Sequence, residues 1–252
     1  MHSLVLCDQF KIQEIACLAT ANGCGIEVDS FYLPEVLTGE PDAIATHREA
    51  MTGIPLRSMH GPFADLCPGS MDPMVSAVAR NRYELAVKIA PELGITHIVF
   101  HHGYVPGTST FDGWLSRCSL FWHDFLKSVP DSITIHLENQ LEHDPALLVA
   151  VVDSVASPHL DICLDIGHAH CFSKHSVTDW IDQLGHRIGY VHLHDNHGDT
   201  DEHLGLGQGS IPMNDVCSAL EGSAPDAVWA VESQIPFIGQ SIAWLKANGF
   251  VD

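Results

Sequence analysis

The most regular feature of the chain is a recurrence of short apolar runs, spaced by about thirty residues, the size of one strand–helix unit. Several runs contain β-branched residues, and turn-forming residues bound them. This pattern is typical of strands that are buried on both faces of a parallel sheet. Eight strands are predicted, at residues 4–6, 25–28, 55–59, 97–100, 133–137, 161–164, 188–193 and 228–231.

The segments between these runs show the spacing of amphipathic helices. Gly94 is expected to end one helix, and Asn248 with Gly249 to end the last. Asp144 and Pro145 are expected to be the N-cap and first residue of another. Helices are predicted around residues 12–19, 78–93, 115–129, 147–155, 177–184, 216–220 and 242–245.

The alternation of strands and helices predicts an α/β protein with a single closed (β/α)8 TIM barrel, a fold of about 250 residues. The chain has 252 residues. The alternative, an open doubly wound sheet, would normally carry a glycine-rich phosphate loop after its first strand. Residues 7–10 read Cys-Asp-Gln-Phe instead. No linker divides residues 1–252, so we expect a single domain.

Composition and charge narrow the classes of function. No run approaches the ~20 apolar residues of a membrane span, and the first residues lack the features of a signal peptide, so we expect a cytoplasmic protein. The eight cysteines form no Cys-x-x-Cys pair, which favours free thiols. The net charge is −21, and no cluster of Lys and Arg is present, so we expect no nucleic-acid partner.

Candidate metal ligands occur at the ends of six successive predicted strands. The carboxyl ends of barrel strands form the catalytic face of a TIM barrel, so these side chains are expected to converge there. Imidazole and carboxylate together suit zinc, manganese or iron. In chain order the residues are His60, His101, Glu138, Asp165 with His168, His192 with Asp195, and Glu232.

Each residue of this set also has a plain structural interpretation. A single His at a strand end is more often hydrogen-bonded than metal-bound, and a lone acidic residue is usually a helix cap or a solvated loop residue. Glu138 and Glu232, however, lie in apolar contexts, where an unpaired carboxylate carries a large desolvation cost. A bound cation would offset that cost, so the set as a whole favours a metal site.

The ligand set resembles that of the xylose-isomerase-like barrel superfamily, over nearly the whole chain. This superfamily includes sugar isomerases and epimerases and also the endonuclease IV (apurinic-site) group. In the epimerase branch one divalent metal is held from the last four strands, at positions that match Glu138, Asp165, His192 and Glu232. In the endonuclease branch further ligands hold three zinc ions, at positions that match His60, His101, His168, Asp201 and His203.

Two departures from the endonuclease pattern argue against DNA as the substrate. Glu202 stands where that motif has an Arg between Asp and His, and no basic loop follows the second predicted strand. No motif places a Lys or Arg at the predicted site to bind a phosphate group, which favours a sugar or polyol over a sugar phosphate. We therefore expect a small-molecule partner, a carbohydrate, with one to three ions of zinc or manganese. Exposed helix faces could form a homodimer.

The resemblance implies a metal-dependent isomerase or epimerase. Glu138 and Glu232 would transfer protons through a metal-stabilised enediolate, and His168 would orient a substrate oxygen. Substrate contacts are expected from residues beside these ligands, namely His194, Asp195, Phe63 and Tyr104.

The alternative is a multinuclear zinc hydrolase, either a phosphoesterase or an amidohydrolase. His60 and His101 would share Glu138 at one ion, and a bridging hydroxide would attack the substrate. A non-enzymatic ligand-binding barrel has less support, because both acid/base positions are filled.

Overall fold

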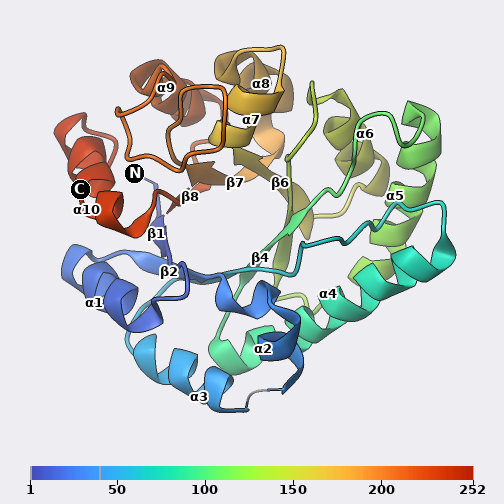
Figure 1. The fold of residues 1–252 in the computed structure, drawn as a ribbon, viewed down its shortest axis with the longest axis horizontal. Coiled ribbons are helices and arrows are strands. Elements are labelled where there is room, and N and C mark those ends of the chain that lie inside the picture. The colour runs from blue at the N-terminus through green and yellow to red at the C-terminus, as the bar shows by residue number, and fades with distance from the viewer. Residues whose placement is uncertain (1, 40, 252) are drawn as a thin grey trace.

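Eight parallel strands form a closed barrel, as predicted, and the helices surround it (Figure 1). The computed structural model describes residues 2–39 and 41–251. All eight predicted strands are present, in the order in which they follow one another along the chain. They are β1 (Leu4–Cys7), β2 (Gly25–Val28), β3 (Arg57–His60), β4 (His97–His101), β5 (Thr134–Glu138), β6 (Leu160–Asp165), β7 (Ile188–Leu193) and β8 (Val228–Val231).

The helices include all seven that the apolar stripes predict, and three more. They are α1 (Ile12–Asn22), α2 (Pro34–Gly39), α3 (Pro41–Ala50), α4 (Pro73–Leu93), α5 (Phe111–Phe125), α6 (Ala146–Val155), α7 (Ile166–Phe172), α8 (Val177–Leu184), α9 (Met213–Ser223) and α10 (Ile235–Ala247). Short 3-10 turns cover Ser30–Tyr32, Leu126–Ser128 and Gly185–Arg187. Within the described part of the chain, no helix combines the length and apolar character that a membrane crossing requires.

Two helix ends test the predicted caps. Gly94 ends α4 in the left-handed conformation, with φ 70°, as expected. The predicted start of α6 was wrong by one residue, because Pro145 is the N-cap and Ala146 the first helical residue. Asp144 still contributes, since its Oδ1 accepts the backbone N–H of Ala146 at 3.0 Å.

The strands present alternate residues to the helices and to the barrel interior. On β5, Ile135 and Leu137 belong to the large apolar core between barrel and helices, whereas His136 and Glu138 do not. A second, smaller apolar cluster contains Val5, Cys7, Val99, Cys163, Tyr190, Val228 and Ala230. The interior is thus apolar only in part, and the remaining inner positions carry polar side chains.

Strand register brings the polar inner residues to the same height. Parallel pairing places His101 beside Glu138, and Asp165 beside His192. His60, His101, Glu138 and Asp165 are each the last residue of a strand. The fold therefore collects these ligand-type side chains at one end of the barrel.

The contact between β4 and the helices α4 and α5 is aromatic. Phe100 is fully buried, and its ring centroid lies 4.1 Å from that of Tyr83 and 6.0 Å from that of Trp122. These rings fix the helices against the strand that carries His101.

Replacing Phe100 by Ala should lower the free energy of unfolding by about 3–5 kcal/mol, because the lost ring leaves a cavity among these aromatic side chains. Urea denaturation followed by circular dichroism measures the change. Leu120→Ala is the matched control, since this α5 side chain is 70% exposed and its loss should cost less than about 0.5 kcal/mol. Equal losses in the two variants would contradict this description of the core.

Candidate metal centre

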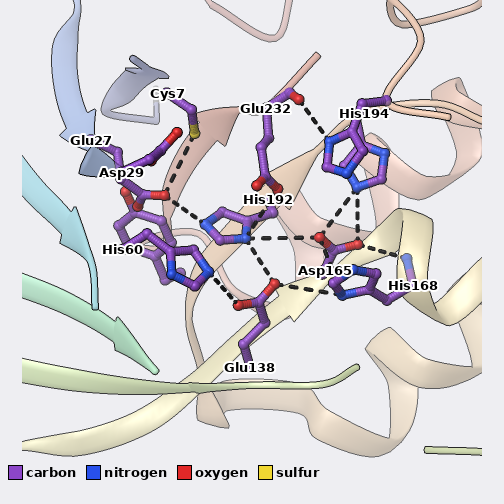
Figure 2. Close-up of polar contacts among 12 residues, drawn as sticks. Cys7, Glu27, Asp29, His60, Glu138, Asp165, His168, His192, His194 and Glu232 are labelled. Carbon is purple, nitrogen blue, oxygen red and sulfur yellow. Dashed lines mark hydrogen bonds and ion pairs between the residues drawn. The ribbon is translucent and has the colours of Figure 1, made fainter. Parts of the chain in front are cut away.

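A cavity of about 370 Å³ opens at the carboxyl ends of the strands. Eight of the residues proposed from the sequence line it, namely His60, Phe63, His101, Glu138, His168, Asp201, His203 and Glu232. Asp165, His192 and His194 are fully buried, and polar contacts connect them to the lining residues (Figure 2).

Glu138, the last residue of β5, lies among imidazoles. Its Oε2 is 3.1 Å from His60 Nε2 and 3.2 Å from His101 Nε2. Its Oε1 is 3.1 Å from His192 Nδ1 and 3.5 Å from His168 Nδ1. Burial alone would raise the pKa of Glu138, but the facing imidazoles outweigh it and hold that pKa well below its usual range. Glu138 is therefore an anion that could connect neighbouring ion sites.

His192, on β7, faces three carboxylates with one nitrogen (Figure 2). The distances from its Nδ1 are 3.1 Å to Glu138 Oε1, 3.3 Å to Glu232 Oε2 and 3.8 Å to Asp165 Oδ2. One ring nitrogen carries at most one proton, so it cannot satisfy three carboxylates. A divalent cation at this point would contact all of them, which makes this group the best fit for a metal.

A further group lies on the loop after β7. Asp201 Oδ2 is 2.9 Å from His203 Nε2 and 3.3 Å from His168 Nε2. His194 lies beneath, with its ring stacked on that of His203 at a centroid distance of 4.0 Å and its Nε2 3.2 Å from both oxygens of Asp165. This second group could hold a separate ion.

Three of the histidines that line the cavity have one ring nitrogen fixed by the backbone. His60, His168 and His203 each place Nδ1 2.9 Å from a backbone carbonyl oxygen. A carbonyl oxygen can only accept, so Nδ1 donates, and the free Nε2 atoms lie 3.1, 3.3 and 2.9 Å from carboxylate oxygens. Metal-binding histidines show this same arrangement, with the non-ligating N–H held by a second partner.

The electrostatics of the cluster also fit a cation. Burial would lower the pKa of His60, but its hydrogen bond to Glu138 outweighs this and raises the pKa to about 9. For His203 the hydrogen bond to Asp201 likewise outweighs burial and raises the pKa to about 10. Oε2 of Glu232 and Oδ1 of Asp201 are buried and have no hydrogen-bond partner among the described residues. Bound metal would supply the positive charge that these groups now take from protons.

Two of the expected substrate contacts lie elsewhere. Tyr104 does not line the cavity, and its ring packs against Trp114 at 5.3 Å instead. Asp195 is fully buried, and its carboxylate accepts the backbone N–H groups of Gly207 at 3.0 Å, Gly209 at 2.9 Å and Ile211 at 3.2 Å. Phe63 does line the cavity, whereas His194 lies below it.

This role of Asp195 explains why glycine stands at positions 207 and 209. Gly207 has φ 80°, and a Cβ on Gly209 would lie 2.4 Å from Asp195 Oδ1. Side chains at these positions would prevent the loop from closing around the carboxylate. The backbone N–H groups of Gly207 and Gly209 are occupied by Asp195, so this loop does not bind phosphate with them.

Five further residues line the cavity, namely Gln9, Phe10, Asp29, Tyr32 and Gln140. Tyr32 is an aromatic residue near a predicted strand end, of the kind expected to stack on a sugar, whereas the other four were not proposed from the sequence. Asp29 directly follows β2, so its carboxylate fits the same pattern of ligand-type residues at strand ends. Gln9 and Phe10 follow β1 but are not metal-ligand types, so that pattern gives no signal for them.

The sequence is similar to those of known proteins. Residues 23–248 match the family described as xylose isomerase-like TIM barrel. An uncharacterized protein of Methanocaldococcus jannaschii, MJ1311, is 31% identical over 190 residues, which cover 70% of this chain and 64% of that protein. The chain thus spans less than two thirds of the length of this curated relative.

Solved structures share the architecture. The TTHB071 protein from Thermus thermophilus, in a crystal soaked with zinc chloride, is 25% identical with a TM-score of 0.80, over 98% of this chain and 97% of that chain. A D-tagatose 3-epimerase-like protein is 25% identical with a TM-score of 0.82, over the same shares of the two chains. A D-allulose 3-epimerase from Methylomonas sp., 16% identical with a TM-score of 0.79 over 98% of both chains, has the same fold. The chain belongs to the xylose isomerase-like TIM barrel family.

Proposed function

We propose that this protein is a divalent-metal-dependent isomerase or epimerase of an uncharged sugar. One observation carries the proposal. Glu138 and Glu232 reach the same cavity from opposite sides, with His192 between them (Figure 2). Two carboxylates on opposite sides of a substrate carbon are what removal of a proton from one face and its return to the other require.

The metal would be held by Glu138, Asp165, His192 and Glu232. A bound zinc or manganese ion would act as a Lewis acid toward adjacent carbonyl and hydroxyl oxygens of the substrate and so stabilise an enediolate. The chain supplies both carboxylates and fixes their positions through the barrel strands.

The proton-transfer roles follow from the contacts. Oε2 of Glu232 lies 3.3 Å from His192 Nδ1, on the side where the ion would be held, so the second oxygen of this carboxylate is left to take a proton from the substrate carbon. Glu138, on the other side, has its Oε2 3.1 Å from His60 Nε2, through which a proton can reach it. His168 lines the cavity beside Glu138 and orients a substrate oxygen.

The cavity wall supports a small, uncharged substrate. Within the described part of the chain, no Lys or Arg lines it, so a phosphate group would find no cationic partner. Tyr32 stacks on Phe63 at 4.6 Å, and Phe63 stacks on His101 at 4.5 Å, which gives an aromatic wall for the apolar face of a sugar. The similarity to a D-tagatose 3-epimerase-like protein supports the same substrate class.

A second candidate function is hydrolysis by a multinuclear zinc site. The observation in its favour is that the ligand-type residues form more than one group. His60, His101 and Glu138 lie together, as do Asp165, His192 and Glu232, and as do His194, Asp201 and His203. The net charge of −21 argues against nucleic acid as its substrate.

Glu232→Gln should reduce exchange of the carbon-bound hydrogen of a ketohexose with solvent deuterium by about 10²–10⁴-fold, because the amide cannot accept that proton. Proton NMR of a ketohexose panel in deuterated buffer measures the exchange. Glu202→Gln is the matched control, since Glu202 pairs with His197 at 2.8 Å and does not line the cavity. Exchange that survives in Glu232→Gln at the wild-type rate would remove Glu232 from this role.

Metal stoichiometry distinguishes the two candidate functions. The isomerase requires one zinc or manganese ion per chain, and His203→Ala should leave that ion in place. For the hydrolase, His203→Ala should remove one equivalent of zinc together with the activity. Elemental analysis of the purified wild-type and His203→Ala proteins measures the number of ions per chain. Two or three zinc ions in the wild-type chain would favour the hydrolase.

Metal-free and metal-loaded protein should respond to pH in opposite directions. With pKa values of about 9 and 10, His60 and His203 stabilise the metal-free fold fully below about pH 6.5, and this contribution is lost as pH rises through those values. Metal binding strengthens over the same range, because ligand nitrogens must lose their protons. Denaturation at pH 6.5, 8 and 9.5, with chelator or with zinc, should therefore give diverging stabilities. Parallel curves would contradict a role for these histidines as ligands.

A further inference from the structure

Glu27, in the middle of β2, is a carboxylate inside the barrel that the proposed reaction does not use. Its side chain is fully buried, and it does not line the cavity. The interior of a TIM barrel is ordinarily filled by branched apolar residues. Removing a carboxylate from water costs several kcal/mol unless it is well paired, so its presence at this position calls for a partner.

That partner is His192. Oε1 of Glu27 lies 2.9 Å from His192 Nε2, and among the described residues this is the ion pair that Glu27 makes. The thiol of Cys7, beside Glu27 in the strand register, donates to the same oxygen at 3.5 Å. Figure 2 shows Glu27 on the side of the His192 ring away from Glu138 and Glu232.

We propose that Glu27 is a positioning residue that keeps the proton of His192 on Nε2 and so reserves Nδ1 for the metal. A carboxylate can only accept, so the ring must donate to it from Nε2. A neutral imidazole has one proton, so Nδ1 then presents a lone pair toward Glu138, Glu232 and Asp165. This inference rests on the proposed metal chemistry of the site.

Loss of Glu27 would allow the opposite tautomer. The proton could then move to Nδ1 and be donated to Glu138 at 3.1 Å, which would block the position where the cation has to sit. Carboxylates that hold the second nitrogen of a metal-binding histidine change metal affinity by about 10–100-fold when they are removed.

The same three side chains suggest one competing explanation. Cys7, Glu27 and His192 lie close enough together to hold an ion themselves. In that case Cys7 would be a ligand rather than a hydrogen-bond donor, and its replacement by Ser would change the number of bound ions.

The experiment compares zinc binding by Glu27→Gln, Glu27→Leu and the wild-type protein, using zinc alone as the probe. The expected result for Glu27→Leu is about 10–100-fold weaker binding, with the same number of ions at saturation and no loss of thermal stability in chelator, whereas Glu27→Gln, whose amide oxygen still accepts from Nε2, should bind zinc more tightly than Glu27→Leu. Glu142→Gln is the matched control. It alters another buried Glu–His pair, in which Glu142 lies 2.8 Å from His102 Nδ1, and it should leave zinc affinity unchanged.

Nitrogen-15 NMR of the zinc-free protein, at a pH where the His192 ring is neutral, reports the tautomer directly. The His192 signal should show the proton on Nε2 in the wild type and in Glu27→Gln, whose amide oxygen still accepts, and on Nδ1 in Glu27→Leu. A purely structural role for Glu27 would lower stability in chelator and leave the tautomer and zinc affinity unchanged, which would overturn the proposal. Loss of one zinc equivalent in Cys7→Ser would overturn it in favour of a separate ion site. Dependence of zinc affinity on Glu27 without hydrogen exchange in any sugar would uphold the positioning role and refute the isomerase.

Discussion

Along each strand of a closed parallel barrel, side chains point alternately toward the helices and toward the interior. This two-residue period determines which side chains face the helices and which face the interior. Apolar residues such as Ile135 and Leu137 take the outer positions, where helices cover them. The inner positions at the carboxyl end are left for imidazoles and carboxylates. Parallel register then aligns them from strand to strand, as with His101 and Glu138. The ligand cluster is in this sense a product of the fold.

Gathering so many ionisable groups in a buried place requires that they neutralise one another. Glu138 does so by facing several imidazoles, and His192 by facing carboxylates on both sides of its ring. Shared contacts of this kind explain why two reaction types can be considered for one site. The groups on β5 to β8 suffice for one ion, and the groups around His60 and Asp201 add further positions.

The sequence predicts the barrel well, because apolar runs bounded by turns mark every strand. It predicts helices only where an apolar stripe is strong. α2 and α3 begin with prolines and lack such a stripe, and α7 starts inside the Asp165-x-x-His168 motif. Glu27 could not be predicted as a site residue, because its neighbours in β2 are apolar and a single polar residue within such a strand forms no recognisable motif.

The misplaced substrate contacts have a physical explanation. On β7 the inner positions are Tyr190 and His192, so the two-residue period places His194 on the inner side and Asp195 on the other. Asp195 is near a strand end, but its side chain points away from the cavity. Tyr104 lies in a loop, where side chains do not alternate regularly in direction. Its ring position is set by packing against Trp114.

Asp195 nevertheless has a large influence on the site. The backbone of Asp195 pairs with that of Leu204 and so closes the loop that carries Asp201 and His203, while its carboxylate accepts from Gly207 and Gly209 in the segment that follows. One buried residue thus fixes two groups that its carboxylate does not bind. In a protein with this fold that lacked it, the strand-borne ligands would keep their places while the loop-borne ones would lose theirs. The number of ions that such a barrel binds could therefore change in evolution through a single residue, while the barrel itself stays the same.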